Sequence, residues 1–226
     1  MAVFCFAWYT SCMQVTKLHK KIDVLQHVHG AKHLNAIYGA GCIKNPNAMF
    51  IFMNPTGKNV SAQKTWGGLR APWIGTKNIW RLFYQLHLIS DVLFEKIQKL
   101  QAKDWTTEFA QEVYNEISAH NVYITNLAKC TQIDARPLKN TVFKEYLETI
   151  YEEIGIIQPT HILTLGNQVS SILLEKPIRV SSYTKNQKEI LKVKTKNFDV
   201  YPVYYPVGQG MRNMPLAIKR IQSVIK

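Results

Sequence analysis

A short apolar run that ends at an Asn-Pro pair places the strongest constraint on how this chain can fold. Residues 49–53 are all apolar, and Asn54, Pro55 and Thr56 follow them directly. A run of this length, apolar on both faces, is typical of a central strand in a parallel sheet. Pro55 has no N–H to donate and keeps the preceding residue out of the helical region, so the strand ends here. The sequence therefore predicts Asn54 at the carboxyl end of a central strand.

The rest of the chain alternates strand signals with helix signals. Further strands are predicted at residues 122–126, 161–165 and 200–204, and a hairpin at the sheet edge is one interpretation of the basic segment 176–197. Apolar residues at helical spacing predict helices over 17–29, 76–86, 90–100, 107–120, 140–154, 166–173 and 213–225. Gly30 is expected to end the first of these helices, and Thr76 and Asn140 are expected to cap the N-termini of the second and the fifth. This alternation predicts one doubly wound α/β/α sandwich around a mostly parallel sheet of four to five strands.

Length and composition suit a single domain over residues 14–226. The chain has 226 residues, and its 46% apolar content supports a sizeable core. The first thirteen residues are apolar and uncharged and lack the basic region of a signal peptide, so we expect a disordered or added start, with Met13 as an alternative initiator. No apolar run approaches the length that spans a membrane.

Charge and cysteine usage indicate the class of partner and the compartment. The formal charge of +13 favours a polyanionic partner, nucleic acid before a membrane surface, although a host with a basic proteome is the alternative. The cysteines form no CxxC pair and are expected to be reduced thiols; they are Cys5, Cys12, Cys42 and Cys130. The expected compartment is the cytoplasm, or the nucleus if the host is eukaryotic.

Polar and aromatic side chains follow three of the predicted strands and one long loop. Asn54, Asn126 and Tyr205 each lie at the carboxyl end of a predicted strand, and these ends meet at one edge of a parallel sheet, where ligands bind. The loop 57–75 is long enough to be functional and carries Trp73 near its end. An indole can stack on a planar base, and an Asn amide offers both a donor and an acceptor.

Five segments, in this order along the chain, resemble motifs of the uracil-DNA glycosylase superfamily. Residues 52–56 (FMNPT) resemble its first motif, GMNPG or GINPG in the single-strand-selective and mismatch-specific branches. Residues 72–75 (PWIG) resemble the PFVG segment of the iron–sulfur family-4 branch, and 122–130 (VYITNLAKC) resemble its VYITNVVKC. Residues 159–166 resemble a P-x-x-I-x-x-LG strand of that branch, and 205–207 fall where the superfamily has HPS.

The chain departs from the family-4 pattern at several positions. Family 4 binds its cluster through four cysteines, and in this chain only Cys130 occupies one of those positions. Tyr146 stands at the spacing of the next ligand. Because one thiolate cannot hold a cluster, we predict no iron and no other cofactor. Met53 stands where family 4 has Glu, and Asn54 stands where mismatch-type enzymes have a catalytic Asn. Tyr205 replaces the His of the second motif.

The resemblance implies a monofunctional DNA glycosylase of base-excision repair, acting on uracil or a related deaminated base flipped out of single- or double-stranded DNA. In that role Asn54 orients the attacking water, Tyr205 donates to uracil O2, Trp73 stacks on the base and Asn126 binds its O4 and N3–H edge. Further substrate contacts are expected from Met53, Pro55 and Thr56. The predicted DNA contacts are phosphate binding by Lys58, Lys64 and Arg212, close backbone approach at Gly208 and Gly210, and a wedge at Met211.

Three other hypotheses remain open from the sequence. The first is a non-catalytic member that holds a base without cleaving it, since Tyr205 replaces the His and no carboxylate is present in the first motif. The second is a glycosylase for thymine or a deaminated purine, since Thr56 stands where some branches use Tyr to exclude the thymine methyl. The third is a basic scaffold that acts through protein partners. We expect a monomer with no membrane partner and no metal site at His27, His29 and His33.

Overall fold

A computed structural model describes residues 2–135 and 138–225, and the side chains of all of these except residues 2–12 and 209. The side chains of Cys5 and Cys12 therefore lie outside the described part. Within it, one sheet has the strand order β1-β3-β2-β4-β6-β5. The strands are β1 (Ala40–Gly41), β2 (Ala48–Phe52), β3 (Val122–Asn126), β4 (His161–Leu165), β5 (Glu189–Val193) and β6 (Lys196–Val203).

The sheet is parallel at its centre and antiparallel at both edges. β3, β2, β4 and β6 pair in parallel, and the short β1 and the hairpin strand β5 add antiparallel edges. The predicted α/β class and mostly parallel sheet are confirmed, but the sheet of the described residues has six strands rather than four to five, and its edge hairpin is formed by β5 and β6 over residues 189–203 rather than within the predicted segment 176–197. β6 starts at Lys196, earlier than the predicted residue 200, because its first residues pair with β5.

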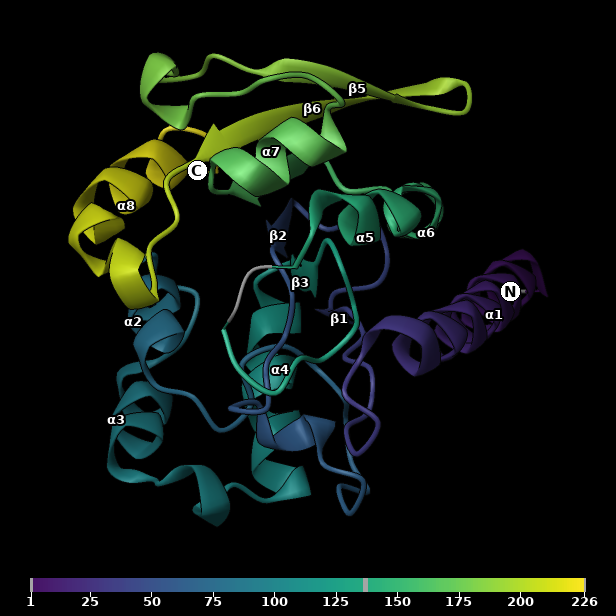
Figure 1. Ribbon diagram of the computed structural model, residues 1–226, viewed down its shortest axis with the longest axis vertical. Helices are drawn as coiled ribbons and strands as arrows, with labels where there is room; N and C mark the ends of the chain where they lie inside the picture. Colours follow the sequence, from purple (N-terminus) through teal and green to yellow (C-terminus); the bar gives the residue numbers. More distant parts are fainter. Residues whose placement is uncertain (1, 136–137, 226) are drawn as a thin grey trace.

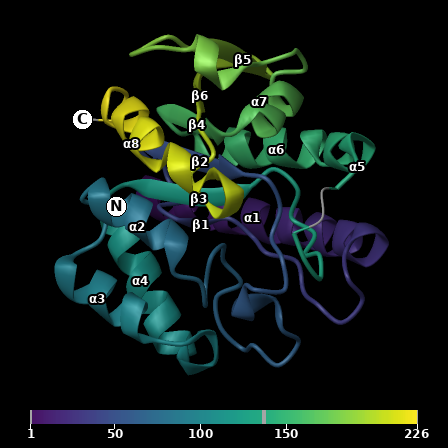
Figure 2. The same ribbon diagram turned by 60° about the vertical axis from the view of Figure 1, so that its left-hand side comes forward.

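Helices cover both faces of the sheet (Figures 1 and 2). They are α1 (Ala2–His29), α2 (Asn78–Gln85), α3 (Asp91–Lys99), α4 (Thr107–Ala119), α5 (Asn140–Glu145), α6 (Leu147–Ile157), α7 (Asn167–Leu173) and α8 (Met214–Gln222), with short 3-10 turns η1 (Val60–Ala62), η2 (Ala102–Asp104), η3 (Val180–Ser182) and η4 (Gly208–Asn213). The core on one face is formed with α2, α3, α4 and α8, and the core on the other with α5, α6 and α7. α1 packs against α6.

The central strand β2 is buried along its whole length, as its sequence predicts. Phe50 and Phe52 pack into the core with α2 and α4, whereas Met49 and Ile51 pack into the opposite core. This alternation is the period of two that a strand imposes. Phe52 is level with Asn126 on the neighbouring β3, so the segments that follow both strands leave the sheet at the same edge.

Helix boundaries differ from the predictions in two places. α1 begins at Ala2 rather than Lys17, because residues 2–29 contain no Pro or Gly that would stop a helix; that the start is disordered or added stays a prediction. The predicted helix over 140–154 is two helices, because the Tyr146 N–H bonds the Phe143 carbonyl in a tight 3-10 turn. Asn140 does not cap this helix, since its amide oxygen accepts a hydrogen bond from Gln168 of α7.

The helices of the described residues include none that is both long enough and apolar enough to cross a bilayer.

Candidate functional site

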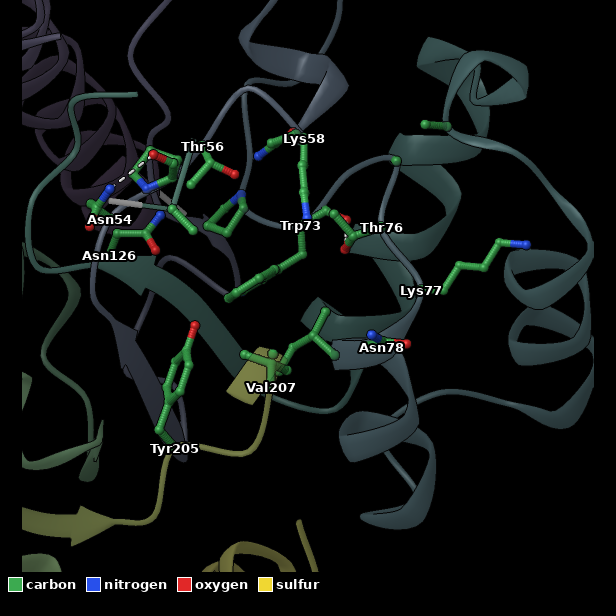
Figure 3. A pocket seen from close by; sticks show the side chains of 18 residues that line it. Asn54, Thr56, Lys58, Trp73, Thr76, Lys77, Asn78, Asn126, Tyr205 and Val207 are labelled. Atoms are coloured by element: carbon green, nitrogen blue, oxygen red, sulfur yellow. Dashed lines mark hydrogen bonds between the residues drawn. The ribbon is translucent and has the colours of Figure 1, made fainter. Parts of the chain in front are cut away.

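A cavity of about 490 Å³ opens at the sheet edge where β2, β3 and β6 end (Figure 3). Eight of the residues predicted from the sequence line it: Asn54, Pro55, Thr56, Lys58, Trp73, Asn126, Tyr205 and Gly208. They come from four segments that are far apart in the chain. The strand ends and the long loop therefore lie together at one edge of the sheet, as predicted. Their arrangement does not by itself assign a role to each side chain.

Asn126 presents an unpaired amide to this cavity. It is the last residue of β3 and is only 2% exposed, yet its Nδ2 has no hydrogen-bond partner among the described residues. An unpaired buried donor costs roughly 1–3 kcal/mol, so such groups are rare unless a ligand completes them. Asn126 is therefore suited to bind a ligand that brings its own acceptor into the cavity.

Trp73 forms an aromatic wall of the cavity in a strained backbone conformation. Its φ of 67° lies in the left-handed region, which a bulky residue avoids and which costs roughly 1–3 kcal/mol. Its carbonyl accepts hydrogen bonds from the Thr76 N–H (3.1 Å), the Thr76 hydroxyl (2.7 Å) and Trp80 Nε1 (3.2 Å). Thr76 therefore fixes this turn instead of capping α2, which begins at Asn78.

The ring of Trp73 is also fixed in place. It meets Phe52 of β2 edge to face, with centroids 5.0 Å apart and planes at 77°. The preceding carbonyl, that of Pro72, accepts a hydrogen bond of 2.6 Å from the buried Tyr114 of α4. In Figure 3 the ring extends into the cavity toward Asn126 and Tyr205. A planar surface held this way in advance can stack on a flat ligand at little entropic cost.

Asn54 sits in a loop that is held in place by the segment after β3. The Pro55 carbonyl accepts from the Gln132 N–H (3.1 Å), and the Gly57 N–H donates to the Gln132 carbonyl (2.7 Å). The half-buried Asn54 uses its own Nδ2 to donate to the Pro55 carbonyl at 3.1 Å. This leaves the amide oxygen of Asn54 as its group for accepting a hydrogen bond from water.

Tyr205 follows β6 and points its hydroxyl into the cavity (Figure 3). Burial raises the pKa of Tyr205 to about 12, so the phenol stays protonated and can donate at neutral pH. Gly210 packs against this residue so closely that a Cβ there would lie 2.2 Å from the Tyr205 carbonyl. The requirement for glycine at 210 is therefore explained by contact with Tyr205.

Five predicted residues do not line the cavity. Met53 packs against the core with α5, α6 and α7, because it continues the Met49–Ile51 face of β2 and so points away from the cavity. Lys64 lines a separate surface hollow beside Asp23. The remaining three lie on η4, just beyond the cavity residue Gly208: Gly210, and the exposed Met211 and Arg212.

Several cavity residues were not predicted from the sequence: Asn59, Pro72, Gly75, Thr76, Lys77, Asn78, Ile79, Ala102, Ala135 and Val207. Pro72 and Gly75 are the first and last residues of the PWIG motif, and the resemblance of that motif is the sequence feature that could have indicated them. Asn59 is buried and bonds the Ala71 carbonyl (2.7 Å), which folds the long loop back on itself. None of the described residues that line the cavity is an Asp or Glu, so the charge there is set by Lys58 and Lys77.

The surroundings of Cys130 do not fit an iron–sulfur cluster. Burial raises the pKa of the Cys130 thiol, whereas a metal ligand has to be a thiolate. The sulfur accepts from Gln132 Nε2 at 3.6 Å and lies beside Tyr146, whose phenol is not a ligand for such a cluster. In the part of the chain that the structure describes, no three His, Cys, Asp or Glu side chains gather as a metal site.

Comparison with known proteins gives one positive result. A family model described as "Uracil DNA glycosylase superfamily" matches residues 38–221, which include all of the cavity. A comparison with the curated proteins finds no match.

Proposed function

The chain belongs to the uracil DNA glycosylase superfamily, and from that premise we propose that it hydrolyses the N-glycosidic bond of uracil, or of a related deaminated base, flipped out of DNA. A glycosylase-type function is general to this superfamily. The observation that carries the finer proposal is the unpaired, 2% exposed amide of Asn126 facing the strained ring of Trp73. A flat base with adjacent acceptor and donor atoms complements these two groups.

Base recognition follows from the chemistry of these two groups. Trp73 stacks on the flipped base. Asn126 donates from Nδ2 to uracil O4 and accepts from N3–H through Oδ1, which would satisfy its buried amide. Cytosine presents a donor at position 4 and an acceptor at N3, so it opposes both bonds. The same amide therefore selects against the normal base from which uracil arises.

Bond cleavage in this proposal proceeds without a carboxylate among the described lining residues. Asn54 orients a water molecule toward C1′ through its amide oxygen, and Tyr205 donates to O2 as negative charge develops on the leaving base. The C1′–N1 bond breaks with its electron pair on the leaving uracil, and the water adds to C1′. Because no described lining residue is a carboxylate, the proton of the water passes to the departing uracil anion or to solvent and not to a general base of the protein. We therefore expect a slow enzyme. Pro55 and Thr56 complete the pocket wall near the base.

The surface beyond the cavity fits contact with DNA. Lys58 is exposed at the cavity rim, and η4 presents Met211, which is 40% exposed, together with Arg212. In the proposal the two cations bind phosphates, while Met211 fills the gap left by the extruded base. Gly208, with φ 57°, lets the backbone turn between the cavity and this wedge.

The test is an abasic-site assay with labelled oligonucleotides that carry uracil in a single strand, uracil opposite guanine, or thymine opposite guanine. We expect uracil release that leaves the strand intact until alkali is added, because the proposed nucleophile is water. Trapping of an enzyme–DNA adduct by borohydride would instead indicate a lysine nucleophile, with Lys58 the candidate from the cavity. Release of thymine at a comparable rate would extend the substrate range.

The second candidate is a member that binds DNA without cleaving it. The absence of a carboxylate among the described lining residues favours it. It predicts salt-sensitive binding of uracil-containing DNA with no abasic product under any of the three conditions.

A further inference from the structure

A fully buried lysine–glutamate pair lies directly behind Asn126. The side chains of Lys129 and Glu153 are 0% and 1% exposed, and Lys129 Nζ is 2.5 Å from Glu153 Oε2. Lys129 belongs to the segment after β3, and Glu153 to α6 on the face of the sheet that lies away from α2 and α4. Neither residue lines the cavity, so neither touches a base bound there.

The pair is completely hydrogen-bonded. Besides Glu153, the Lys129 ammonium donates to the Thr125 hydroxyl and to the backbone carbonyl of Asn126, which uses all three of its protons. Glu153 Oε1 accepts from the Tyr123 hydroxyl at 2.8 Å and from the Thr125 hydroxyl at 3.0 Å. The pair thereby bonds three groups of β3: the side chains of Tyr123 and Thr125 and the backbone carbonyl of Asn126.

The space around this cluster is filled. A Cβ at Gly39 would lie 2.1 Å from the Tyr123 hydroxyl oxygen and 2.4 Å from Glu153 Oε1. The carbonyl of Lys129 itself accepts from the Ile37 N–H at 3.1 Å. The carboxylate is therefore closely packed by its neighbours, and the three hydrogen bonds of the ammonium direct one of its protons to the Asn126 carbonyl.

Stability alone is a weak explanation for such a pair. Desolvation of two charges offsets most of their attraction, and apolar residues of similar volume often serve as well or better. Asn126, by contrast, has a specific need for support, because none of the residues that the structure describes offers its side-chain nitrogen a partner that would orient it. The orientation of the amide then depends on the backbone of residue 126, and the bond from Lys129 holds that backbone.

We propose that Lys129, held by Glu153, is a positioning residue that aims the Asn126 amide into the base cavity. The inference rests on the proposed function for its kinetic consequence but not for its structural one. A misplacement of about 1 Å can cost roughly 10²-fold in rate, so loss of this support should weaken base-specific steps far more than binding to the DNA backbone.

The decisive variant replaces both charges, Lys129→Met with Glu153→Leu, so that no unpaired charge remains buried. Its Tm should fall, because the Tyr123 and Thr125 hydroxyls lose their acceptor, but at a temperature where the variant is fully folded kcat for uracil release should fall by about 10²-fold and KM for DNA should change little. Tyr123→Phe is the matched control, since it removes a donor to Glu153 without touching the Asn126 carbonyl. Its activity should remain within about threefold of the wild type.

A second readout separates this inference from the proposed function. In ¹⁵N-labelled protein, the side-chain NH₂ signals of Asn126, identified by their loss in Asn126→Ala, should be sharp in the wild type and averaged or broadened in the double variant. If the wild type releases no uracil, this measurement still decides the positioning role. Full activity in the folded double variant, or Asn126 signals unchanged from those of the wild type, would overturn the positioning role of Lys129.

Discussion

The ends of β2 and β3 each carry an asparagine at the cavity, but the two side chains are supported differently. Asn126 is almost fully buried, its amide nitrogen is unpaired, and its carbonyl is bonded by a buried ammonium. Asn54 is half-buried in a proline loop, and its amide nitrogen bonds the next carbonyl in the chain. A side chain that recognises a base benefits from a fixed orientation and from a hydrogen-bonding group that no protein atom already uses. A group that holds a mobile water needs only one free acceptor.

The largest effect is expected at the rigid site. Asn126→Ala should lower kcat/KM for uracil release by about 10³-fold, because the uracil edge would be buried without partners. Single-turnover kinetics with labelled uracil-containing DNA measure this loss. Asn197→Ala, an exposed position at the start of β6, is the matched control and should be neutral. A loss below about tenfold would remove the distinction between the two asparagines.

The next effect concerns the donor opposite Asn126. Tyr205→Phe should lower kcat by about 10²-fold, since the leaving base would lose the phenolic hydrogen bond to O2. Tyr204→Phe changes the adjacent tyrosine, which does not line the cavity, and should have no such effect. Equal rates for Tyr205→Phe and wild type would make Tyr205 a packing residue only.

Tyr205 also predicts a dependence of stability on alkaline pH. Burial raises its pKa from 10.0 to about 12, so the unfolded chain ionises first. The stabilisation from keeping this phenol neutral is complete below pH 10 and is lost as the pH rises toward 12. The difference in Tm between wild type and Tyr205→Phe should therefore shift against the wild type as the pH rises from 10 toward 12, which thermal unfolding at a series of pH values measures.

A smaller loss is expected at the looser site. Asn54→Ala should lower kcat by roughly tenfold, because a water molecule can be held by other groups at reduced occupancy. Asn54→Asp should act in the opposite direction and raise kcat above that of the wild type, since a carboxylate can accept the proton of the water. Uracil release measured for both variants tests this, and a rate unchanged in each would show that Asn54 does not contact the water.

The smallest effect is expected one residue earlier, at Met53, which directly follows β2. Met53 points into the core, so Met53→Leu should keep the rate of uracil release within about twofold and cost less than about 1.5 kcal/mol of stability. Urea unfolding and the abasic-site assay measure both quantities. A large loss of activity with stability retained would place Met53 in contact with the substrate after all.

The local pattern of the sequence was sufficient to predict the sheet and one edge of it. An apolar run ending in Asn-Pro, and a second strand ending in Asn126, report burial on two faces and an abrupt stop, and both are properties of neighbouring residues. The parallel pairing that brings the two strand ends level follows from the strand–helix alternation. Asn54, Asn126 and Tyr205 could be placed at the cavity in this way, whereas Thr56, Lys58 and Gly208 were expected only from the family resemblance.

Tertiary structure decided the features that depend on contacts between distant segments. No sequence pattern predicts that Trp73 adopts a positive φ held by Thr76 and Trp80, or that η2 contributes Ala102 to the cavity. The motif resemblance suggested a substrate contact by Met53, but the side chain packs against the opposite core, as expected from the alternation of side chains along β2. The sequence by itself determined which elements form and where they stop, because these depend on nearby residues. Only the fold decided which side chains share the cavity and that Lys129 and Glu153 meet behind Asn126, because these contacts join separate segments of the chain; Lys129 and Glu153, for example, are 24 positions apart.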